Sequence, residues 1–393
     1  MRIYIINCNW GNGGPGSISR DLYYAAIEKG HIVRFAYGRG DIPSNINCFR
    51  FTNNLDIYSH YFKALFFDAE GFGSKTSTKR LISDIESFKP DIISIHNELG
   101  HILNVDIFVK YIRKSKIRTF WTLHDAWLLT GHCITGLCDR FAIGCGKCPR
   151  KKEYPRSLFV DKSSQNLQKK KSIFIPVIDN LSFITPSIWL KNLLEHSHLK
   201  SYSVNVINNG IDLKVFSHVD SDLRNKYHLE NKTILLAVAN VWSSFKGLCY
   251  FYELSTLLDN DKYALVCIGS KQPRHINKKY KVITLDKTER IEELVQWYSV
   301  ADWFINPTLG DNFPTVNLEA LACGTPVITF NTGGSPESIE GCGFVVKQKD
   351  IFSIKRIVES NNSLITKESC LNKAKNYDKS LKYGAYLALF ENF

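Results

Sequence analysis

The residues between Asp311 and Glu337 have the types and the spacing to hold a ligand that carries both an anion and hydroxyl groups. Asp311-Asn312-Phe313-Pro314 precedes a segment that contains Glu319, and Gly333-Gly334 precedes Glu337. Pro314 indicates a helix start, where unpaired backbone N–H groups favour negative charge. Carboxylates only accept hydrogen bonds, so Asp311 and Glu319 suit the donor hydroxyls of a sugar. A nucleotide sugar offers both kinds of group.

The N-terminal half has a glycine-rich loop and two histidines that follow apolar segments. Gly13, Gly14 and Gly16 lie just after the first apolar segment, and glycines let the backbone approach a phosphate closely. A tight turn, or the loop of a dehydrogenase, would look similar. His124 and the pair His96-Asn97 stand at the ends of predicted strands, where parallel sheets bind ligands. His96-Asn97 could hold an acceptor or simply anchor its loop.

Four cysteines lie close together in the sequence and could bind a metal. Cys133, Cys138, Cys145 and Cys148 are separated by four, six and two residues. Thiolates around a tetrahedral zinc ion require such a tight loop. In a reducing cytosol zinc is favoured over two disulfides, and the alternative is a set of free or redox-paired thiols. We expect a structural zinc site.

Strands that alternate with amphipathic segments must position these residues. The chain has 393 residues, which suits two domains rather than one core. The pattern predicts an α/β fold of two doubly wound, Rossmann-like parallel sheets that bind ligands at the carboxyl ends of their strands. We expect an N-terminal domain over 1–180, a C-terminal domain over 181–377 and a final helix over 378–393. Strands are predicted near residues 3–8, 32–37, 92–96, 119–124, 183–186, 204–207, 234–238, 264–268, 282–285, 303–306 and 327–330.

The net charge of +12 is the main clue to partners beyond small molecules. Basic residues gather near residues 110–118, 150–152 and 169–171, and none belongs to a known nucleic-acid module. An anionic membrane surface and a solvated basic surface explain these patches equally well. No apolar run of eighteen residues and no signal peptide is evident, and the eleven scattered cysteines are not a secreted disulfide framework. We expect a cytoplasmic protein, peripheral at the inner face of the plasma membrane if it contacts lipid.

The segment from Asp311-Asn312-Phe313-Pro314 to Leu318-Glu319-Ala320-Leu321-Ala322-Cys323-Gly324-Thr325-Pro326 resembles the two-carboxylate signature of family 4 glycosyltransferases. These retaining enzymes use nucleotide sugars and have the GT-B fold. The residues of this motif are similar to those of a branch of the family that assembles exopolysaccharide, capsule and the O-antigen of lipopolysaccharide. The resemblance implies two domains facing a shared cleft and a C-terminal helix that crosses back to the first domain. It also implies transfer of a sugar from a nucleotide-diphosphate sugar to a glycan acceptor, often lipid-linked, without a catalytic metal.

The resemblance assigns roles to residues of this chain. Lys246 matches the lysine that binds the diphosphate, His124 and Asp311 match residues that hold the donor sugar, and Glu319 matches the residue that accepts from the ribose hydroxyls. The glycine-rich loop is expected to face the diphosphate or the acceptor. Two departures stand out: most members have Glu where this chain has Asp311, and an Arg near the position of Asn240. Further donor contacts are expected from Asn240, Asn312, Phe313, Pro314, Gly333, Gly334 and Glu337, where Glu337 could instead cap a helix.

Two other functions fit the same sequence. A GT-B sugar-nucleotide epimerase would share the fold but consume the donor without an acceptor. A non-catalytic nucleotide-sugar-binding partner of a polysaccharide assembly complex would fit the missing Arg and the shorter carboxylate. Donor turnover with and without an acceptor separates the three functions. The nucleotide base, the sugar, the acceptor and the oligomeric state are not encoded in any motif that we recognise.

Overall fold

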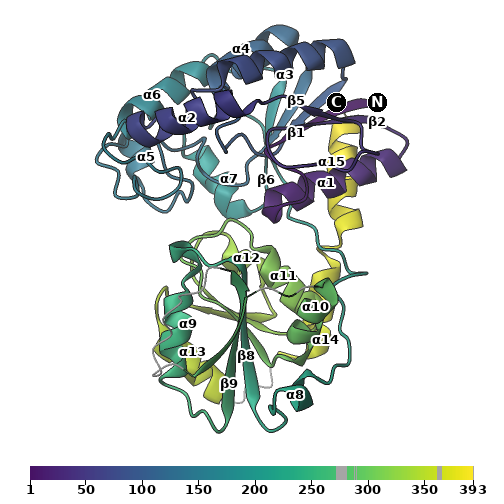
Figure 1. Ribbon diagram of the computed structural model, residues 1–393, viewed down its shortest axis with the longest axis vertical. Helices are drawn as coiled ribbons and strands as arrows, with labels where there is room; N and C mark the ends of the chain where they lie inside the picture. The colour runs from purple at the N-terminus through teal and green to yellow at the C-terminus, as the bar shows by residue number, and fades with distance from the viewer. Residues whose placement is uncertain (271–280, 287, 289, 361–364, 393) are drawn as a thin grey trace. The chain divides into compact units, whose positions relative to one another are not determined.

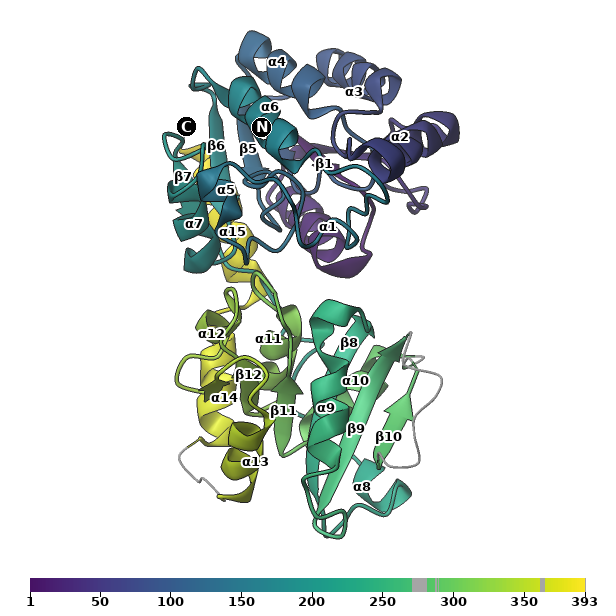
Figure 2. The same cartoon turned by 90° about the vertical axis from the view of Figure 1, so that its left-hand side faces the viewer.

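The computed structural model describes residues 1–270, 281–286, 288, 290–360 and 365–392. The chain forms two compact units, one of Met1–Asn208 with Tyr383–Phe393 and the other of Asn209–Lys382. Each unit is built on one parallel sheet (Figures 1 and 2). Among the described residues, no helix is both long enough and apolar enough to cross a membrane.

The first unit has a seven-stranded sheet in the order β3-β2-β1-β4-β5-β6-β7, and all neighbouring strands are parallel. The chain starts at β1 and moves outward in one direction, then returns to β4 and moves outward in the other. The strand order therefore reverses between β1 and β4, which is where doubly wound sheets bind ligands. The strands are β1 (Arg2–Asn7), β2 (Ile32–Tyr37), β3 (Cys48–Arg50), β4 (Ile92–Ile95), β5 (Arg118–Thr122), β6 (Leu181–Thr185) and β7 (Val204–Val206).

Helices cover both faces of this sheet (Figure 1). On one face α1 (Gly13–Glu28) and the C-terminal α15 (Lys379–Glu391) pack against the strands. On the other face lie α3 (Lys75–Phe88), α4 (Val105–Ser115), α6 (Ser163–Phe174) and α7 (Ile188–Glu195). In the chain α2 (Asn54–Phe67) comes before α3, and the short α5 (Arg140–Ile143) comes between α4 and α6. Because both faces are covered, strands such as β4 are apolar almost throughout.

The second unit has a six-stranded parallel sheet in the order β10-β9-β8-β11-β12-β13, which reverses between β8 and β11. One face packs on α9 (Leu248–Ser255) and α13 (Ile351–Glu359). The other packs on α10 (Ile291–Val300), α11 (Thr315–Ala322) and α14 (Lys367–Lys375). The strands and short helices are β8 (Thr233–Val241), β9 (Tyr263–Ser270), β10 (Val282–Leu285), β11 (Trp303–Asn306), β12 (Val327–Phe330), β13 (Gly343–Val346), α8 (Leu223–Lys226), η1 (Ser244–Lys246) and α12 (Ser335–Ser338).

The structure confirms the predicted α/β class and corrects the domain boundary. We expected the second domain to begin at residue 181, but β6 and β7 pair with β5 and extend the first sheet. The first unit therefore continues to Asn208. The final helix does cross back, because residues from Tyr383 onward cluster with the first unit and bury Tyr386, Leu387 and Phe390 there.

Candidate functional site

Lys246 and Asp311 form an ion pair at the point where the second sheet reverses its strand order. Lys246 ends the 3-10 turn η1 after β8, and Asp311 lies in the loop after β11, the neighbouring strand. The Lys246 Nζ atom donates to Asp311 Oδ2 at 2.6 Å. Their side chains are 36% and 19% exposed, so the pair is partly accessible to a ligand. Sequence analysis expected both residues at one site, and the structure brings them into contact.

The second glycine loop is joined to the backbone of Asp311. The N–H group of Gly334 donates to the Asp311 carbonyl at 3.1 Å. Gly333 has a φ of 56°, and a Cβ atom there would lie 1.9 Å from the Asp311 carbonyl oxygen. Only glycine allows this close approach. Gly333 and Gly334 therefore hold the Asp311 loop in place, as well as lying beside the predicted donor site.

A buried polar network that sequence analysis missed supports these loops. Asn317, on α11, is fully buried; its Oδ1 accepts from Asn306 Nδ2 at 2.8 Å, and its Nδ2 donates to Ser338 Oγ at 2.9 Å and Ser335 Oγ at 3.2 Å. These bonds connect α11 with the end of β11 and with α12. A fully satisfied buried network fixes the relative positions of its elements. Its only sequence signal is an amide in an otherwise apolar helix.

Glu319 lies one turn into α11 and is largely enclosed by protein. The hydroxyl of Tyr298 donates to Glu319 Oε2 at 2.9 Å. Burial raises the pKa of Glu319 to about 7, although the bond from Tyr298 opposes the shift. A carboxyl group that titrates near neutrality is uncommon outside functional sites. This environment agrees with the expectation that Glu319 accepts hydrogen bonds from hydroxyl groups.

The other residues predicted to contact the donor differ in how far their side chains are buried. Phe313 is a core residue, with its ring 5.6 Å from that of Tyr377, so its side chain does not fit the predicted donor contact and only its backbone could serve. Pro314 is buried as well and acts as the N-cap of α11. Asn240, near the end of β8, is exposed, whereas Asn312 and Glu337 are half-buried. Glu337 lies in the first turn of α12, where a carboxylate is favourable without any ligand.

His124 and His96 contact each other at the carboxyl edge of the first sheet. His124 Nε2 lies 3.2 Å from His96 Nδ1, and His96 Nε2 lies 3.2 Å from Ser94 Oγ. Burial lowers the pKa of His124 to about 3, and burial together with His124 lowers the pKa of His96 well below its ordinary value. Both rings are therefore neutral near pH 7. His96 is fully buried, which does not fit its predicted contact with an acceptor, and it orients His124 instead.

Asn97 and the first glycine loop are more open than His96. Asn97 Oδ1 accepts from the N–H of Leu99 at 2.9 Å, so this residue anchors its own loop. Gly13, Gly14 and Gly16 lie in the first turn of α1, which begins earlier than the expected loop would allow. A Cβ atom on Gly13 or Gly14 would meet no other atom within 4 Å, whereas one on Gly16 would lie 2.4 Å from Asn9 Oδ1. Gly16 is thus required for packing, and Gly13 and Gly14 leave room for a ligand.

Next to His124, the structure places three ionisable side chains that our sequence analysis did not single out: Lys170 and Glu98 are buried, and Asp125 is half-buried. Lys170 donates from Nζ to the carbonyls of Trp127 at 2.6 Å and Thr130 at 2.9 Å. Burial lowers the pKa of Lys170 to about 7 and raises those of Asp125 and Glu98 to about 6 and 8. Lys170 belongs to a basic run that we read as a surface patch, but it is fully buried. These groups fix the loop that follows His124.

The four cysteines of the 133–148 segment line one small cavity. Its wall also includes His132, and its volume is about 10 Å³, the space that one water-sized particle needs. All four thiols are free. Among the described residues, however, no three of these sulfur atoms lie within 4.8 Å of one another. The sequence therefore predicted the grouping, and the ion that we expected there remains a prediction.

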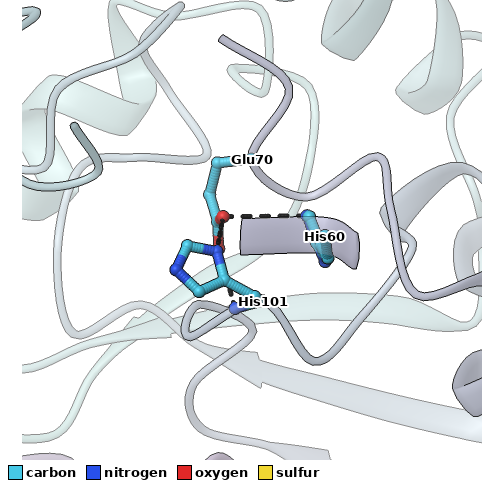
Figure 3. A group of neighbouring side chains, drawn as sticks. All are labelled: His60, Glu70 and His101. Atoms are coloured by element: carbon cyan, nitrogen blue, oxygen red, sulfur yellow. Dashed lines mark hydrogen bonds and ion pairs between the residues drawn. The ribbon is translucent and has the colours of Figure 1, made fainter. Parts of the chain in front are cut away.

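The buried residues His60, Glu70 and His101 lie together and are of types that bind metal ions (Figure 3). His60 and Glu70, however, already bond to other groups of the protein. His60 Nε2 accepts from the N–H groups of Gly71 at 3.0 Å and Gly73 at 3.3 Å, so it has no lone pair for a metal. Glu70 accepts from the His101 ring at Nδ1 and from its backbone N–H. Burial by itself raises the pKa of Glu70, but His101 and His60 outweigh it and lower the pKa below its usual value. An ionised Glu70 therefore orients His101.

His101 lines a basic pocket that sequence analysis did not identify. The pocket has a volume of about 440 Å³. In the described part of the chain, neither Arg39 nor Arg50 has a carboxylate partner within 4 Å, and the buried Arg39 Nε has no hydrogen-bond acceptor. Both arginines follow or end strands, at the edge where parallel sheets bind ligands. We call this the arginine pocket; it is lined by Arg39, Arg50, Asn54, Ile57, Tyr58, Tyr61 and His101.

Known proteins resemble this chain both in sequence and in fold. Residues 232–360, which include Lys246, Asp311 and Glu319, match the family model described as glycosyl transferases group 1. The protein WcaC of Escherichia coli K12, whose name assigns it to glycosyl transfer in colanic acid biosynthesis, is 25% identical over 87% of this chain and 86% of its own length. A Campylobacter jejuni N-acetylgalactosaminyltransferase that acts on N,N'-diacetylbacillosaminyl-diphospho-undecaprenol is 28% identical over 49% of this chain and 55% of its own.

A solved structure confirms the fold over the whole chain. HepE of Anabaena, crystallised with UDP-glucose, has a TM-score of 0.69 to this chain, is 13% identical and is covered completely, as is this chain. At this identity the likeness speaks for the fold alone. The sequence matches and the paired Lys246 and Asp311 at the strand-order reversal agree with it. The chain is therefore a glycosyltransferase with the GT-B fold, and its residues 232–360 are similar to the glycosyl transferases of group 1.

Proposed function

We propose that this glycosyltransferase moves a sugar from a nucleotide-diphosphate sugar to a lipid-linked glycan during the assembly of a surface polysaccharide, with retention at the anomeric carbon. The observation that carries the proposal is the Lys246–Asp311 ion pair at the strand-order reversal of the second sheet. A cation for phosphate and an acceptor for sugar hydroxyls lie 2.6 Å apart there. The name of the Campylobacter jejuni transferase, which acts on a diphospho-undecaprenol-linked sugar, supports the choice of acceptor class, and the name of WcaC supports a role in polysaccharide assembly.

The donor is held by groups that the second unit already orients. An ammonium group has three donors, so Lys246 can contact the diphosphate while it keeps its bond to Asp311. Asp311 accepts from a hydroxyl of the sugar, and Glu319 accepts from the ribose hydroxyls when it is ionised. As the bond between the sugar and the diphosphate breaks, negative charge grows on the phosphate oxygens. Lys246 stabilises that charge, which is the main catalytic contribution of the protein.

His124 supplies an uncharged ring that can form hydrogen bonds with the donor sugar. Because burial keeps its ring neutral, His124 can donate from one nitrogen and accept at the other without placing a second positive charge near the reacting carbon. His96 and Ser94 fix the orientation of this ring. In a retaining transfer the acceptor hydroxyl attacks from the side of the leaving group, so its proton can pass to the departing phosphate. No metal is needed for these steps.

The acceptor fits the arginine pocket and the helix beside it. Arg39, Arg50 and His101 suit a phosphate or diphosphate group. Along α2, large apolar side chains are exposed, notably Leu55 at 85% and Phe62 at 54%. An anion pocket beside an exposed apolar face suits an amphiphile with a phosphorylated head and a hydrocarbon chain. The same face would place α2 at an anionic membrane surface.

Donor turnover with and without an acceptor tests the proposed function. The purified full-length chain is incubated with uridine or guanosine diphosphate sugars, alone and with membrane lipids that carry diphosphate-linked glycans. We expect release of the nucleoside diphosphate and a lipid product with the anomeric configuration of the donor, observed by NMR, only when the acceptor is present. Donor consumption without an acceptor would indicate an epimerase. Saturable donor binding without any turnover would indicate a non-catalytic partner.

Replacement of Arg50 by Ala separates acceptor binding from donor binding. Because each charge-assisted hydrogen bond contributes about 1.5–3 kcal/mol, we expect the KM for the lipid-linked acceptor to rise about 10- to 100-fold while the KM for the donor is unchanged.

Replacement of Phe62 by Ser tests the exposed apolar face of α2. Phe62→Ser should lower binding to vesicles with anionic lipid and leave transfer to a water-soluble acceptor intact. Arg356→Ala, on the exposed surface of α13, is the control. An equal loss with soluble and lipid acceptors in Phe62→Ser would contradict the role of α2.

A further inference from the structure

His132 has a buried ring nitrogen that no group in the described part of the protein satisfies. Its side chain is 1% exposed, and its Nδ1 is hydrogen bonded to Asp68 Oδ1 at 2.5 Å. The other nitrogen, Nε2, is buried without a hydrogen-bond partner. A buried polar atom left unpaired costs about 1–3 kcal/mol, so such an atom requires an explanation. One explanation is a ligand that this nitrogen binds.

The unpaired nitrogen belongs to the residue that lines the cysteine cavity. His132 and the four cysteines of the 133–148 segment share the wall of this cavity, whose volume suits one small ion. The bond to Asp68 fixes the proton of the neutral ring on Nδ1 and leaves the lone pair on Nε2 available. A carboxylate that binds the far nitrogen of a histidine in this way is the usual second partner of a metal-ligating histidine.

We propose that this cavity binds a structural Zn²⁺ ion through His132 Nε2, the thiolates of Cys145 and Cys148, and the thiolate of either Cys133 or Cys138. A tetrahedral set of one nitrogen and three sulfurs is a common structural zinc site, and soft thiolate ligands disfavour magnesium and calcium. Each cysteine that binds releases its thiol proton to solvent, and the fourth cysteine stays a thiol. The ligand set thus includes a histidine that the spacing of the cysteines alone does not reveal.

The ion must draw the cysteine loop inward. Zinc to sulfur distances of ~2.3 Å place bound sulfurs within about 4 Å of one another, whereas in the described part of the chain no three of these sulfurs lie within 4.8 Å of one another. The loop is built for a tight turn, because Gly144, Cys145, Gly146 and Lys147 all have positive φ. For Cys145 and Lys147 this conformation is unfavourable without compensation. Bonds from Cys145 and Cys148 to one ion would supply that compensation.

Zinc at this point would connect three parts of the first unit. Asp68, which ends α2, also accepts from the backbone N–H of Lys162 at 2.8 Å, just before α6. The backbone N–H groups of Cys148 and Ser163 both donate to Asp161. The ion would therefore fasten the loop that follows His124 to α2 and to α6. Its role would be structural, and donor chemistry would not depend on it directly.

Metal analysis of the full-length chain tests the proposal. The protein is expressed with zinc, purified under reducing conditions and measured by mass spectrometry of its metals. We expect about one zinc per chain in the parent and in the controls Cys249→Ser and His196→Asn, which change exposed residues outside the cavity. We expect a loss of most of the zinc in His132→Asn and Cys145→Ser, with a lower melting temperature. Circular dichroism verifies that each variant is folded.

A cobalt-substituted parent protein gives a readout that does not depend on variants. Cobalt bound by thiolates in a tetrahedral site absorbs strongly in the visible and near-ultraviolet regions, and titration of zinc should abolish these bands at one equivalent. Absence of zinc and of a cobalt spectrum in reduced, folded parent protein would overturn the proposal. Full zinc content in His132→Asn would overturn the assignment of His132 and leave a site of four cysteines. Zinc equally retained by Cys145→Ser and His132→Asn would place the ion elsewhere.

Discussion

Lys246→Met is expected to lower kcat/KM for sugar transfer by about 10²–10³, the usual effect of removing one charged group that stabilises growing negative charge. Methionine keeps most of the length and volume of lysine but cannot donate to phosphate. The fall should appear mainly in kcat, because the charge on the leaving diphosphate is largest in the transition state. Steady-state kinetics with varied donor and a saturating acceptor measure it. Lys355→Met, on the surface of α13, should leave both constants unchanged.

A double variant shows whether the Lys246–Asp311 pair is catalytic or only structural. In this structure the two side chains neutralise each other at 2.6 Å, and Lys246→Met leaves the Asp311 carboxylate without its partner. If the pair only stabilises the fold, Lys246→Met with Asp311→Asn should recover activity, because the unpaired charge is gone. We expect the double variant to be stable and inactive. Recovery of more than about half of the parent activity would show that neither charge acts on the donor.

The sequence predicted the sheets well because they are buried on both faces. Strands such as β1, β4 and β12 appear as short apolar runs, and their predicted positions agree with the structure within a few residues. β3 and β13 were missed, since β3 has three residues at a sheet edge and β13 begins with a glycine. The domain boundary was also wrong. The polar stretch before residue 180 precedes α6 within the first unit, and no local pattern tells which sheet a strand joins.

The candidate site could be predicted where its chemistry lies in a continuous motif. Asp311 and the Gly333-Gly334 pair are near one another in the chain, and the structure bonds the Gly334 N–H group to the Asp311 carbonyl. Glu319 lies in the helix that follows Asp311. The arginine pocket could not be found in this way, because Arg39, Arg50 and His101 come from three separate segments. The same reason hides His132 Nε2 and the burial of Lys170. Side chains that become functional through burial have no local signature.

The half-buried Glu319 leads to a second large effect, in which a variant is more stable and less active. The pKa of Glu319 rises from 4.5 to about 7 in the folded protein. Between these two pH values the folded state holds a proton that the unfolded state has lost, so this group lowers stability as pH rises through that window. Above pH 7 the cost is fully present. Glu319→Gln removes it, and we expect a higher melting temperature than the parent at pH 8 and no difference at pH 4.5.

The affinity for the nucleotide of the donor should rise as pH rises, because only the ionised Glu319 accepts hydrogen bonds from two ribose hydroxyls. With a pKa of about 7, about a tenth of Glu319 is ionised at pH 6 and about nine tenths at pH 8. The affinity for a nucleoside diphosphate, measured by calorimetry, should therefore rise by up to about 10-fold over this range in the parent.

Glu319→Gln should bind the nucleoside diphosphate about 10- to 100-fold more weakly than the parent at pH 8, since charged hydrogen bonds contribute about 1.5–3 kcal/mol each. Glu319→Ala should show almost no transfer. Glu340→Gln changes an exposed carboxylate and controls for titration of the nucleotide itself, which is the same in every variant. If Glu319→Gln were stabilised but kept the affinity and pH profile of the parent, Glu319 would be a buried structural carboxyl, and the nucleotide would have to bind elsewhere on the second unit.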